Sequence, residues 1–350
     1  MAGATCASDY EAFAYHGGAL DVARRLRPDA PQPWIDLSTG VNPHAYPLPR
    51  LELDVWARLP DRDALAGLEA AAAQRYGAKP GTIVAGPGSQ ALIQILARNA
   101  PRGVRAALGP TYGGHAEAFA AAGVRLLEQD SLDALADADV AIVGNPNNPD
   151  GRVASRAGLL DLSQRLARRD GWLIVDEAFA DFDGAGESLA PVLPEKGAVI
   201  LRSFGKAYGL AGLRLGFAVA SPEIASMLRG ALGPWPVSGP AIAIGARALA
   251  DPNWAAAAGA RLGEDAARLD ALLRATGWRI LGGTRLFRLA EKSDAEAAFR
   301  RLLSAGILTR PFAGGGDRLR FGIPAEEAHW LRLAAALTPK GNSLQLLLNT

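Results

Sequence analysis

The sequence predicts an α/β protein with a large domain around a mostly parallel sheet and a smaller α+β domain. From Ile83 to about Val219, short apolar runs alternate with helical patterns. Apolar strands that alternate with helices are typical of parallel sheets covered on both faces. After Pro240 the pattern changes to a long alanine-rich helical region, then to shorter strands and helices. The 350 residues are enough for one large domain or two medium domains.

The elements of the large domain are expected where the periodicity is clearest. A helix is expected over residues 62–76, because Leu65, Leu68 and Ala72 fall on one face. Continuous apolar runs predict the strands of the sheet, whose ligands bind at the carboxyl ends. These strands are residues 104–108, 124–127, 140–143, 172–175, 199–201 and 215–219, with further helices at residues 90–99, 114–122 and 156–169.

Four segments are expected along the chain. Residues 1–45 form an N-terminal arm that joins the small domain and the active site, and residues 1–50 are expected to be extended because they are rich in Pro and Gly. Residues 46–245 form the large domain, and residues 338–350 form a tail without an assigned role. In the small domain, residues 246–337, strands are expected at 278–281, 286–289, 307–309 and 318–321, and helices at 294–303 and 325–337.

The composition argues against several classes of protein. The net charge of +1 gives no reason to expect nucleic acid or an anionic membrane as a partner. No apolar run is long enough to span a membrane, and residues 1–15 lack the basic and apolar segments of a secretory signal. Cys6 is the only cysteine, which fits a reducing cytoplasm. The four histidines lack metal-ligand spacing, so no metal site is predicted.

Lys206 is the first candidate for chemistry. It is one of five lysines among 37 basic residues, so the other 32 are arginines. It lies between Ser203 and Arg214, in a segment so rich in glycine that no stable helix is expected there. Because lysine can lose its proton and arginine cannot, this position suits an amine that forms a Schiff base with a carbonyl cofactor. The alternative is a solvated lysine in a surface turn.

Three further motifs lie at the ends of predicted strands. Residues 86–90 (Gly-Pro-Gly-Ser-Gln) lead into a helix, whose free N–H groups favour a phosphate. Residues 145–151 (Asn-Pro-Asn-Asn-Pro-Asp-Gly) form a proline-fixed turn that can hold an asparagine rigidly. Asp176 ends an apolar strand and needs a partner, for which a pyridinium nitrogen is suited. Taken singly, these motifs also fit a helix cap, a polar loop and a structural ion pair.

Along the chain the four motifs occur in the order phosphate motif, asparagine turn, strand-end aspartate and lysine. In this order they resemble the class I/II aminotransferase family of pyridoxal-phosphate enzymes, and most closely its histidinol-phosphate aminotransferase branch. The resemblance implies fold type I, with a large sheet of the seven-stranded type, and pyridoxal 5′-phosphate as the cofactor. It also implies that Lys206 holds the cofactor, that Asp176 pairs with its ring nitrogen, and that Asn148 donates to its O3′ oxygen. The other implied cofactor residues are Tyr112, which stacks on the ring, and Ser89, Gln90, Ser203 and Arg214, which bind the phosphate.

Two positions depart from the family pattern. Phe179 replaces a tyrosine, so one hydrogen bond to O3′ is absent and the Schiff base should lose its proton less readily. Leu59, in the run Arg-Leu-Pro-Asp of residues 58–61, replaces a tyrosine that in many relatives reaches the phosphate of the neighbouring subunit. The resemblance still implies a homodimer.

Both ends of the chain bear on the reaction. Residues 16–18 (His-Gly-Gly) and 36–43 (Asp-Leu-Ser-Thr-Gly-Val-Asn-Pro) resemble the L-threonine-O-3-phosphate decarboxylases of cobalamin biosynthesis, as do residues 203–206 and 319–324. The implied reaction is the decarboxylation of L-threonine O-3-phosphate to (R)-1-aminopropan-2-yl phosphate. The implied substrate residues are His16, Gly17, Ser38, Asn148, Arg310 and Arg320. The alternative for residues 16–18 is a mobile arm whose glycines only allow turns.

Guanidinium groups suit both anionic groups of such a substrate, and the sequence does not decide which arginine takes the carboxylate and which the phosphate. Lys206 would return the proton to Cα.

Two alternative functions remain at this point. An aminotransferase acting on histidinol phosphate or another amino acid would use the same cofactor residues and would need a 2-oxo acid. A pyridoxal-phosphate-binding protein without turnover would show cofactor absorbance alone.

Overall fold

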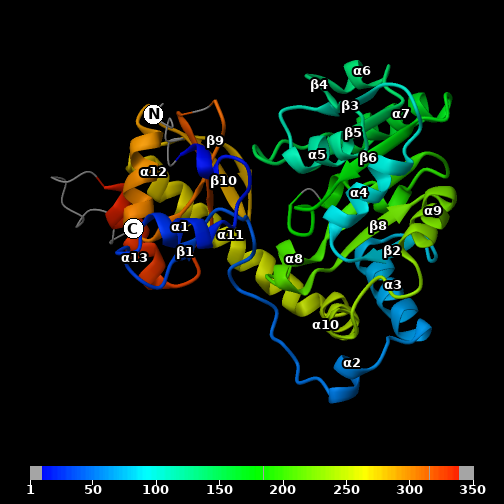
Figure 1. The fold of residues 1–350 in the computed structure, drawn as a ribbon, viewed down its shortest axis with the longest axis horizontal. Helices are drawn as coiled ribbons and strands as arrows, with labels where there is room; N and C mark the ends of the chain where they lie inside the picture. Colours follow the sequence, from blue (N-terminus) through cyan, green and yellow to red (C-terminus); the bar gives the residue numbers. More distant parts are fainter. Residues whose placement is uncertain (1–9, 184, 315, 339–350) are drawn as a thin grey trace, which may run out of the picture. The chain divides into compact units, whose positions relative to one another are not determined.

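The computed structural model describes residues 10–183, 185–314 and 316–338 (Figure 1). The chain divides into two compact units. The larger unit is Ala45–Ala258, and the smaller unit combines Met1–His44 with Gly259–Thr350. The second division falls inside helix α11 (Pro252–Ala275). No helix in the described ranges is both long enough and apolar enough to cross a membrane.

A seven-stranded sheet forms the centre of the larger unit's described residues. Strand β8 runs opposite to the other six strands of this sheet, so the predicted mostly parallel sheet is confirmed. Because β5, β6 and β7 are adjacent and parallel, their carboxyl ends share one edge of the sheet. In spatial order the strands are β2 (Ile83–Gly86), β8 (Gly216–Ala220), β7 (Ala198–Ser203), β6 (Trp172–Asp176), β5 (Val140–Gly144), β3 (Arg105–Leu108) and β4 (Leu127–Gln129).

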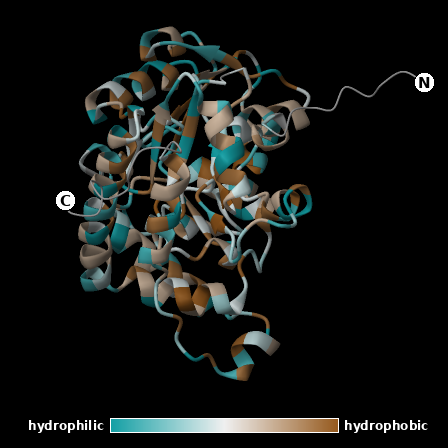
Figure 2. Ribbon diagram, turned by 90° about the vertical axis from the view of Figure 1, so that its left-hand side faces the viewer, coloured by the Kyte–Doolittle hydropathy of each residue, from teal (hydrophilic) through white to brown (hydrophobic). Residues whose placement is uncertain are grey.

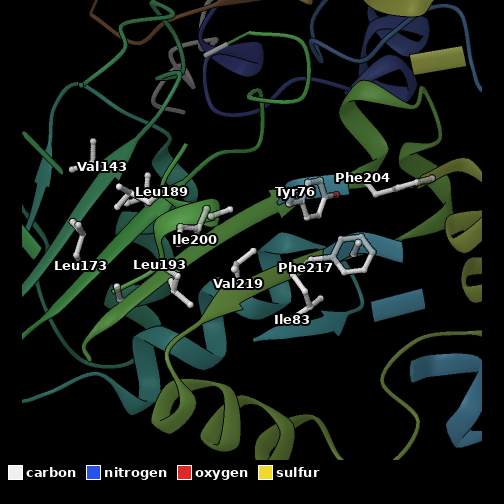
Figure 3. Close-up of a cluster of buried hydrophobic side chains, with 14 of the residues drawn as sticks. Tyr76, Ile83, Val143, Leu173, Leu189, Leu193, Ile200, Phe204, Phe217 and Val219 are labelled. Atoms are coloured by element: carbon white, nitrogen blue, oxygen red, sulfur yellow. The ribbon is translucent and has the colours of Figure 1, made fainter. Parts of the chain in front are cut away.

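The sheet is buried on both faces, as its continuous apolar strands require. Along β6, Leu173 and Val175 pack in one hydrophobic cluster, and Ile174 packs in another. Successive side chains of a strand point to opposite faces, so each face needs its own cover. Figure 3 shows part of the first cluster, around Ile200 and Phe217. Residues of α3, α7 and α10 complete this cluster, whereas α4, α5 and α9 cover the opposite face.

The four helices predicted between residues 62 and 169 lie within a few residues of their predicted positions. Figure 2 shows hydrophobic and hydrophilic residues mixed along the helices, as expected for helices with one buried side. The predicted helices are α3 (Arg62–Tyr76), α4 (Ser89–Asn99), α5 (Gly113–Ala121) and α7 (Arg156–Ala167). No separate prediction covers α2 (Leu53–Ala57), α6 (Leu132–Leu135) and α9 (Pro222–Leu232). Helices α10 (Gly239–Leu249) and α11 divide the alanine-rich region.

The segment around Lys206 differs from the prediction. Phe204–Ala207 form a short helix, α8, although the glycines made a helix unexpected. Phe204 and Ala207 are buried, and the Phe204 ring stacks on Tyr208 with 4.3 Å between ring centroids. Tertiary packing therefore outweighs the weak local propensity, as it does in most short helices of proteins.

The smaller unit is an α+β structure, as predicted. Its antiparallel sheet has the order β12 (Arg310–Pro311), β13 (Arg318–Gly322), β10 (Phe287–Glu291) and β9 (Arg279–Thr284). Helices α12 (Ala295–Ser304) and α13 (Glu327–Leu337) pack against each other. The predicted strands and helices of this unit are thus present, and β12 is an additional short strand.

The expectation of an extended N-terminal segment is wrong for part of the described residues. Residues Leu20–Leu26 form helix α1, and Ile35–Asp36 form strand β1. Strand β1 pairs in parallel with β11 (Ile307–Leu308), from the other end of the chain. A two-residue strand has no periodicity of its own, so this pairing across more than two hundred residues leaves no trace in the local sequence.

Candidate active site

Strand ends bring the first candidate residues together in the larger unit. Asp176 is the last residue of β6 and pairs in register with Gly144 of β5 and Leu201 of β7. The backbone N–H of Asn145 donates to the Asp176 carbonyl oxygen at 2.8 Å, so the asparagine turn begins beside this aspartate. The carboxyl edge of the sheet therefore holds the predicted carboxylate and the predicted turn, as expected for a ligand site in a parallel sheet.

Asp176 is held by a histidine that the sequence did not indicate. The His115 Nε2 lies 3.0 Å from the Asp176 Oδ2, and the Ala178 N–H donates to Oδ1 at 3.1 Å. Asp176 is 8% exposed and His115 is 1% exposed. The His115 Nδ1 is buried without a hydrogen-bond partner among the described residues, so we assign the ring proton to Nε2. Sixty-one positions separate the pair, and no local pattern predicts it.

Tyr112 is fixed in place by its neighbours. Its hydroxyl donates to the Gln90 side-chain oxygen at 3.0 Å, and its ring meets His115 edge to face with centroids 5.6 Å apart. A Cβ added to Gly114 would lie 2.4 Å from the Tyr112 ring, so only glycine allows this approach. His115 therefore contacts both the Tyr112 ring and the Asp176 carboxylate. A planar aromatic ligand with a ring nitrogen would require both groups, one for its face and one for its nitrogen.

The phosphate motif forms a close-packed cradle. Gly216 of β8 pairs with Gly86 on one side and with Ser203 on the other. A Cβ at Gly216 would lie 2.4 Å from the Ser89 backbone nitrogen, at the start of α4. A Cβ at Gly88 would lie 2.7 Å from the Arg214 guanidinium. The start of α4, the hydroxyl residue Ser203 and the Arg214 cation therefore lie close together around Gly216 and Gly88. This arrangement fits a phosphate-binding site.

Lys206 is half-buried on α8, with its Nζ 5.6 Å from the centroid of the Phe179 ring. The family tyrosine is therefore replaced by a phenyl face close to the amine, with no hydroxyl. In the asparagine turn, Asn145 accepts from the Ala154 N–H at 2.8 Å, and Asn147 donates to the Asp150 side chain at 2.8 Å. These two asparagines hold the turn, and the predicted ligand Asn148 is half-buried beside them.

A buried ion cluster of Arg202, Glu177 and Asp181 lies next to the strand ends. Glu177, next to Asp176, accepts from the Arg202 Nη1 at 2.8 Å, and Arg202 is followed by Ser203. Asp181 lies 3.7 Å from the same guanidinium. Burial raises the pKa of Glu177, and Arg202 opposes that rise. This cluster links the loop after β6 to the end of β7, and so holds two candidate residues in register.

The smaller unit contains the remaining candidates, His16, Gly17, Ser38, Arg310 and Arg320. Arg310 and Arg320 are direct partners on β12 and β13, and both are buried. Burial and the charge of Arg310 hold the pKa of Arg320 well below its usual value. Two buried guanidinium groups on facing residues repel each other, so this arrangement favours a bound anion. The Arg320 Nη2 also donates to the Ser38 carbonyl oxygen at 2.6 Å.

Comparisons with known proteins agree with this fold. The family model for aminotransferase class I and II matches residues 32–343. Threonine-phosphate decarboxylases are similar over 92% of the chain: that of Pseudomonas aeruginosa is 44% identical over 96% of its own length, and that of a Sinorhizobium species is 40% identical over 97%. The solved histidinol-phosphate aminotransferase of Sinorhizobium meliloti, in complex with pyridoxal-5′-phosphate, has a TM-score of 0.78 at 22% identity, covering 96% of this chain and 97% of that one.

The fold and the strand-end site define a class of pyridoxal-phosphate enzymes of fold type I, which confirms the predicted fold class. The chain belongs to the aminotransferase class I and II family. The predicted cofactor is supported by this membership, and the residues present fit it: a lysine amine, a supported carboxylate, an aromatic face and a phosphate cradle around Gly216. The individual roles of the site residues remain predictions.

Proposed function

We propose that the protein decarboxylates L-threonine O-3-phosphate to (R)-1-aminopropan-2-yl phosphate, with pyridoxal 5′-phosphate as its cofactor, in cobalamin biosynthesis. The observation that carries this proposal is the 40–44% identity to two threonine-phosphate decarboxylases over nine-tenths of the chain. The paired guanidinium groups of Arg310 and Arg320 support a substrate with two anionic groups. Phosphothreonine carries both a carboxylate and a phosphate, which such groups bind well.

The cofactor, when bound, withdraws electrons from the bond that breaks at the substrate's Cα. The larger unit supplies the binding groups for it: the α4 terminus, Ser203 and Arg214 take the phosphate. Tyr112 offers its ring face, held by Gln90. Asp176, fixed by His115, places a negative charge where a protonated ring nitrogen needs one.

The protein's own residues then decide which bond is broken. Arg310 and Arg320 bind the substrate's anionic groups and thereby set the orientation of the bonds at Cα. The Lys206 amine would hold the cofactor through Nζ until the substrate amine takes its place. Lys206 then carries a proton on Nζ and donates it to Cα after carbon dioxide has left. The Phe179 ring beside Nζ excludes water from one side of this amine.

The test measures carbon dioxide released from L-threonine O-3-phosphate by the cofactor-loaded protein without any 2-oxo acid. Catalytic release with equal amounts of aminopropanol phosphate is expected. Lys206→Ala should reduce the rate by at least about 10²–10⁴-fold, the usual contribution of positioned proton transfer. Lys196→Ala, an exposed lysine of the same unit, is the matched control and should keep the wild-type rate. Wild-type turnover in Lys206→Ala would refute the role of this lysine.

The two alternatives give different results in the same assay. An aminotransferase would release no carbon dioxide and would transfer the amino group of histidinol phosphate once 2-oxoglutarate is added. A binding protein without turnover would show the cofactor absorbance and no product from any amino acid. Either result would refute the decarboxylase proposal.

We also propose that the protein is a cytoplasmic homodimer. A hollow of about 830 Å³ in the larger unit is lined by apolar side chains, including Leu48, Trp56, Leu59 and Trp235. Each of these four is more than half exposed, although large apolar groups favour burial. The same hollow is lined by Gly209 and Gly212, which follow Lys206 in the chain. A second copy bound there would cover the apolar surface beside the loop that follows Lys206.

The proposed cytoplasmic location rests on the single cysteine.

A further inference from the structure

Asp36 is a carboxylate that the proposed reaction does not use. It ends strand β1 in the smaller unit. Its Oδ1 accepts two hydrogen bonds from the same residue, from the Ser38 N–H at 2.8 Å and from the Ser38 hydroxyl at 2.6 Å. Two bonds from one residue hold the turn at positions 36–38 in a single conformation, because a charged acceptor strengthens both.

The Ser38 hydroxyl is occupied on both sides. It donates its only proton to Asp36 and accepts from the Gly18 N–H at 2.7 Å. Ser38 is 1% exposed. A hydroxyl has one proton to donate, so in this arrangement it cannot also donate to an anionic substrate. The Ser38 side chain therefore joins Gly18 to Asp36.

The same turn supports the substrate arginine. The Ser38 carbonyl oxygen accepts from the Arg320 Nη2 at 2.6 Å, and the neighbouring Leu37 carbonyl accepts from the Gly322 N–H at 2.7 Å. The turn and strand β13 are thus joined at Arg320 and again two residues later, at Gly322. The charge of Asp36 also opposes the burial and the Arg310 repulsion that lower the pKa of Arg320. Asp36 is therefore linked to Arg320 by both geometry and charge.

Residues 16–18 rest on the same turn. A Cβ added to Gly17 would lie 2.3 Å from the Ser38 carbonyl oxygen, so this approach requires glycine. The Gly18 N–H contact to Ser38 fixes the next residue. The position of the half-buried His16 is consequently set by the turn on which these two glycines lie.

We propose that Asp36 is a positioning residue of the enzyme, which acts through Ser38 to orient the Arg320 guanidinium and to seat residues 16–18. Ser38, predicted from the sequence as a substrate residue, belongs to this support and does not contact the anions of the substrate. The inference deepens the proposed function and rests on it, because it takes Arg320 as a substrate-binding arginine.

The experiment is a double-mutant cycle between Asp36 and Arg320. Asp36→Asn keeps the shape of the side chain and removes its charge, and Arg320→Lys keeps a cation and loses the forked geometry. L-Threonine O-3-phosphate is mixed with each cofactor-loaded protein, and the dissociation constant is read from the change in cofactor absorbance immediately after mixing, before the substrate is consumed. Asp36→Asn should weaken binding about tenfold in the wild-type background, as expected for loss of a charged contact. In the Arg320→Lys background it should change binding less than about twofold, because the two residues act as one unit.

Two controls separate positioning from general damage. Asp29→Asn and Ser293→Ala alter exposed residues of the same unit and should leave binding unchanged. Cofactor affinity should also be unchanged in Asp36→Asn, because the predicted cofactor residues lie in the other unit. Ser38→Ala should repeat the Asp36→Asn result, with loss of binding in the wild-type background and little loss beside Arg320→Lys.

Equal losses in both backgrounds, for Asp36→Asn or for Ser38→Ala, would overturn the inference, and so would wild-type affinity in Asp36→Asn. The absorbance change is read before turnover, so this outcome is separate from the test of the proposed function. A wild-type protein that binds phosphothreonine but releases no carbon dioxide would refute the decarboxylase proposal and leave the cycle as a valid test of positioning.

Discussion

Replacing Arg202 by methionine should destabilise the larger unit severely. Arg202 is 4% exposed, and it is the cation between two buried carboxylates, Glu177 and Asp181. The three charges sum to −1, and the substitution leaves −2 in the same volume. Methionine fills nearly the same space, so the effect measures charge and not a cavity.

The magnitude follows from the contacts that remain. Glu177 keeps the Ser188 hydroxyl at 2.7 Å and the Leu189 N–H at 3.1 Å, and it loses Arg202. Neither Asp181 side-chain oxygen has a hydrogen-bond partner among the described residues, so the ion pair with Arg202 is its main compensation. Breaking a buried pair by removing one member costs about 3–5 kcal/mol. With a urea slope of about 3 kcal/mol/M, the midpoint should fall by about 1–1.7 M.

The loss of stability caused by Arg202→Met should depend on pH. Burial raises the pKa of Glu177 in the folded protein, and Arg202 limits the rise. A carboxyl with a raised folded pKa contributes its full stability below its unfolded value of 4.5, and this contribution is lost as the pH rises through the folded value. Without Arg202 the folded pKa rises further, so the loss should be larger at about pH 8 than at about pH 5.

Equilibrium urea denaturation, followed by tryptophan fluorescence at both pH values, measures the effect. Arg98→Met, an exposed arginine on α4, is the control and should stay within about 0.5 kcal/mol of the wild type. A triple variant with Arg202→Met, Glu177→Gln and Asp181→Asn removes all three charges and should regain most of the loss. A loss under about 1 kcal/mol in Arg202→Met, or the same loss at both pH values, would refute this reasoning.

Three further predictions concern the site and the surface. Gly216→Ala should weaken cofactor binding at least about tenfold by equilibrium dialysis, because its Cβ would meet the Ser89 nitrogen at 2.4 Å; unchanged affinity would contradict the cradle. His115→Phe should lower the turnover number about 10–100-fold through loss of the support for Asp176, and a wild-type rate would exclude that support. Trp56→Glu should convert the proposed dimer to a monomer in sedimentation analysis, whereas an intact dimer would exclude this surface.

The candidate cofactor residues could be proposed from sequence motifs because each motif is local. The glycines at residues 86–90, the prolines of the asparagine turn and the short strand before Asp176 depend on backbone conformation within a few residues. The resemblance to a known family then supplied their common purpose. The departure at Phe179 was also visible in the sequence, and the structure places that ring beside Lys206.

The alternation of apolar runs and helical patterns determined the class of fold, because burial on both faces of a parallel sheet leaves a periodic trace along the chain. Only the tertiary structure decided which distant polar groups meet: His115 with Asp176, Arg202 with Glu177, and Asp36 with Arg320 through Ser38. It also gave the helix at Lys206 and the pairing of β1 with β11. Such contacts join residues whose own neighbours in sequence carry no mark of the partner, since packing energy is gained only after the chain has folded.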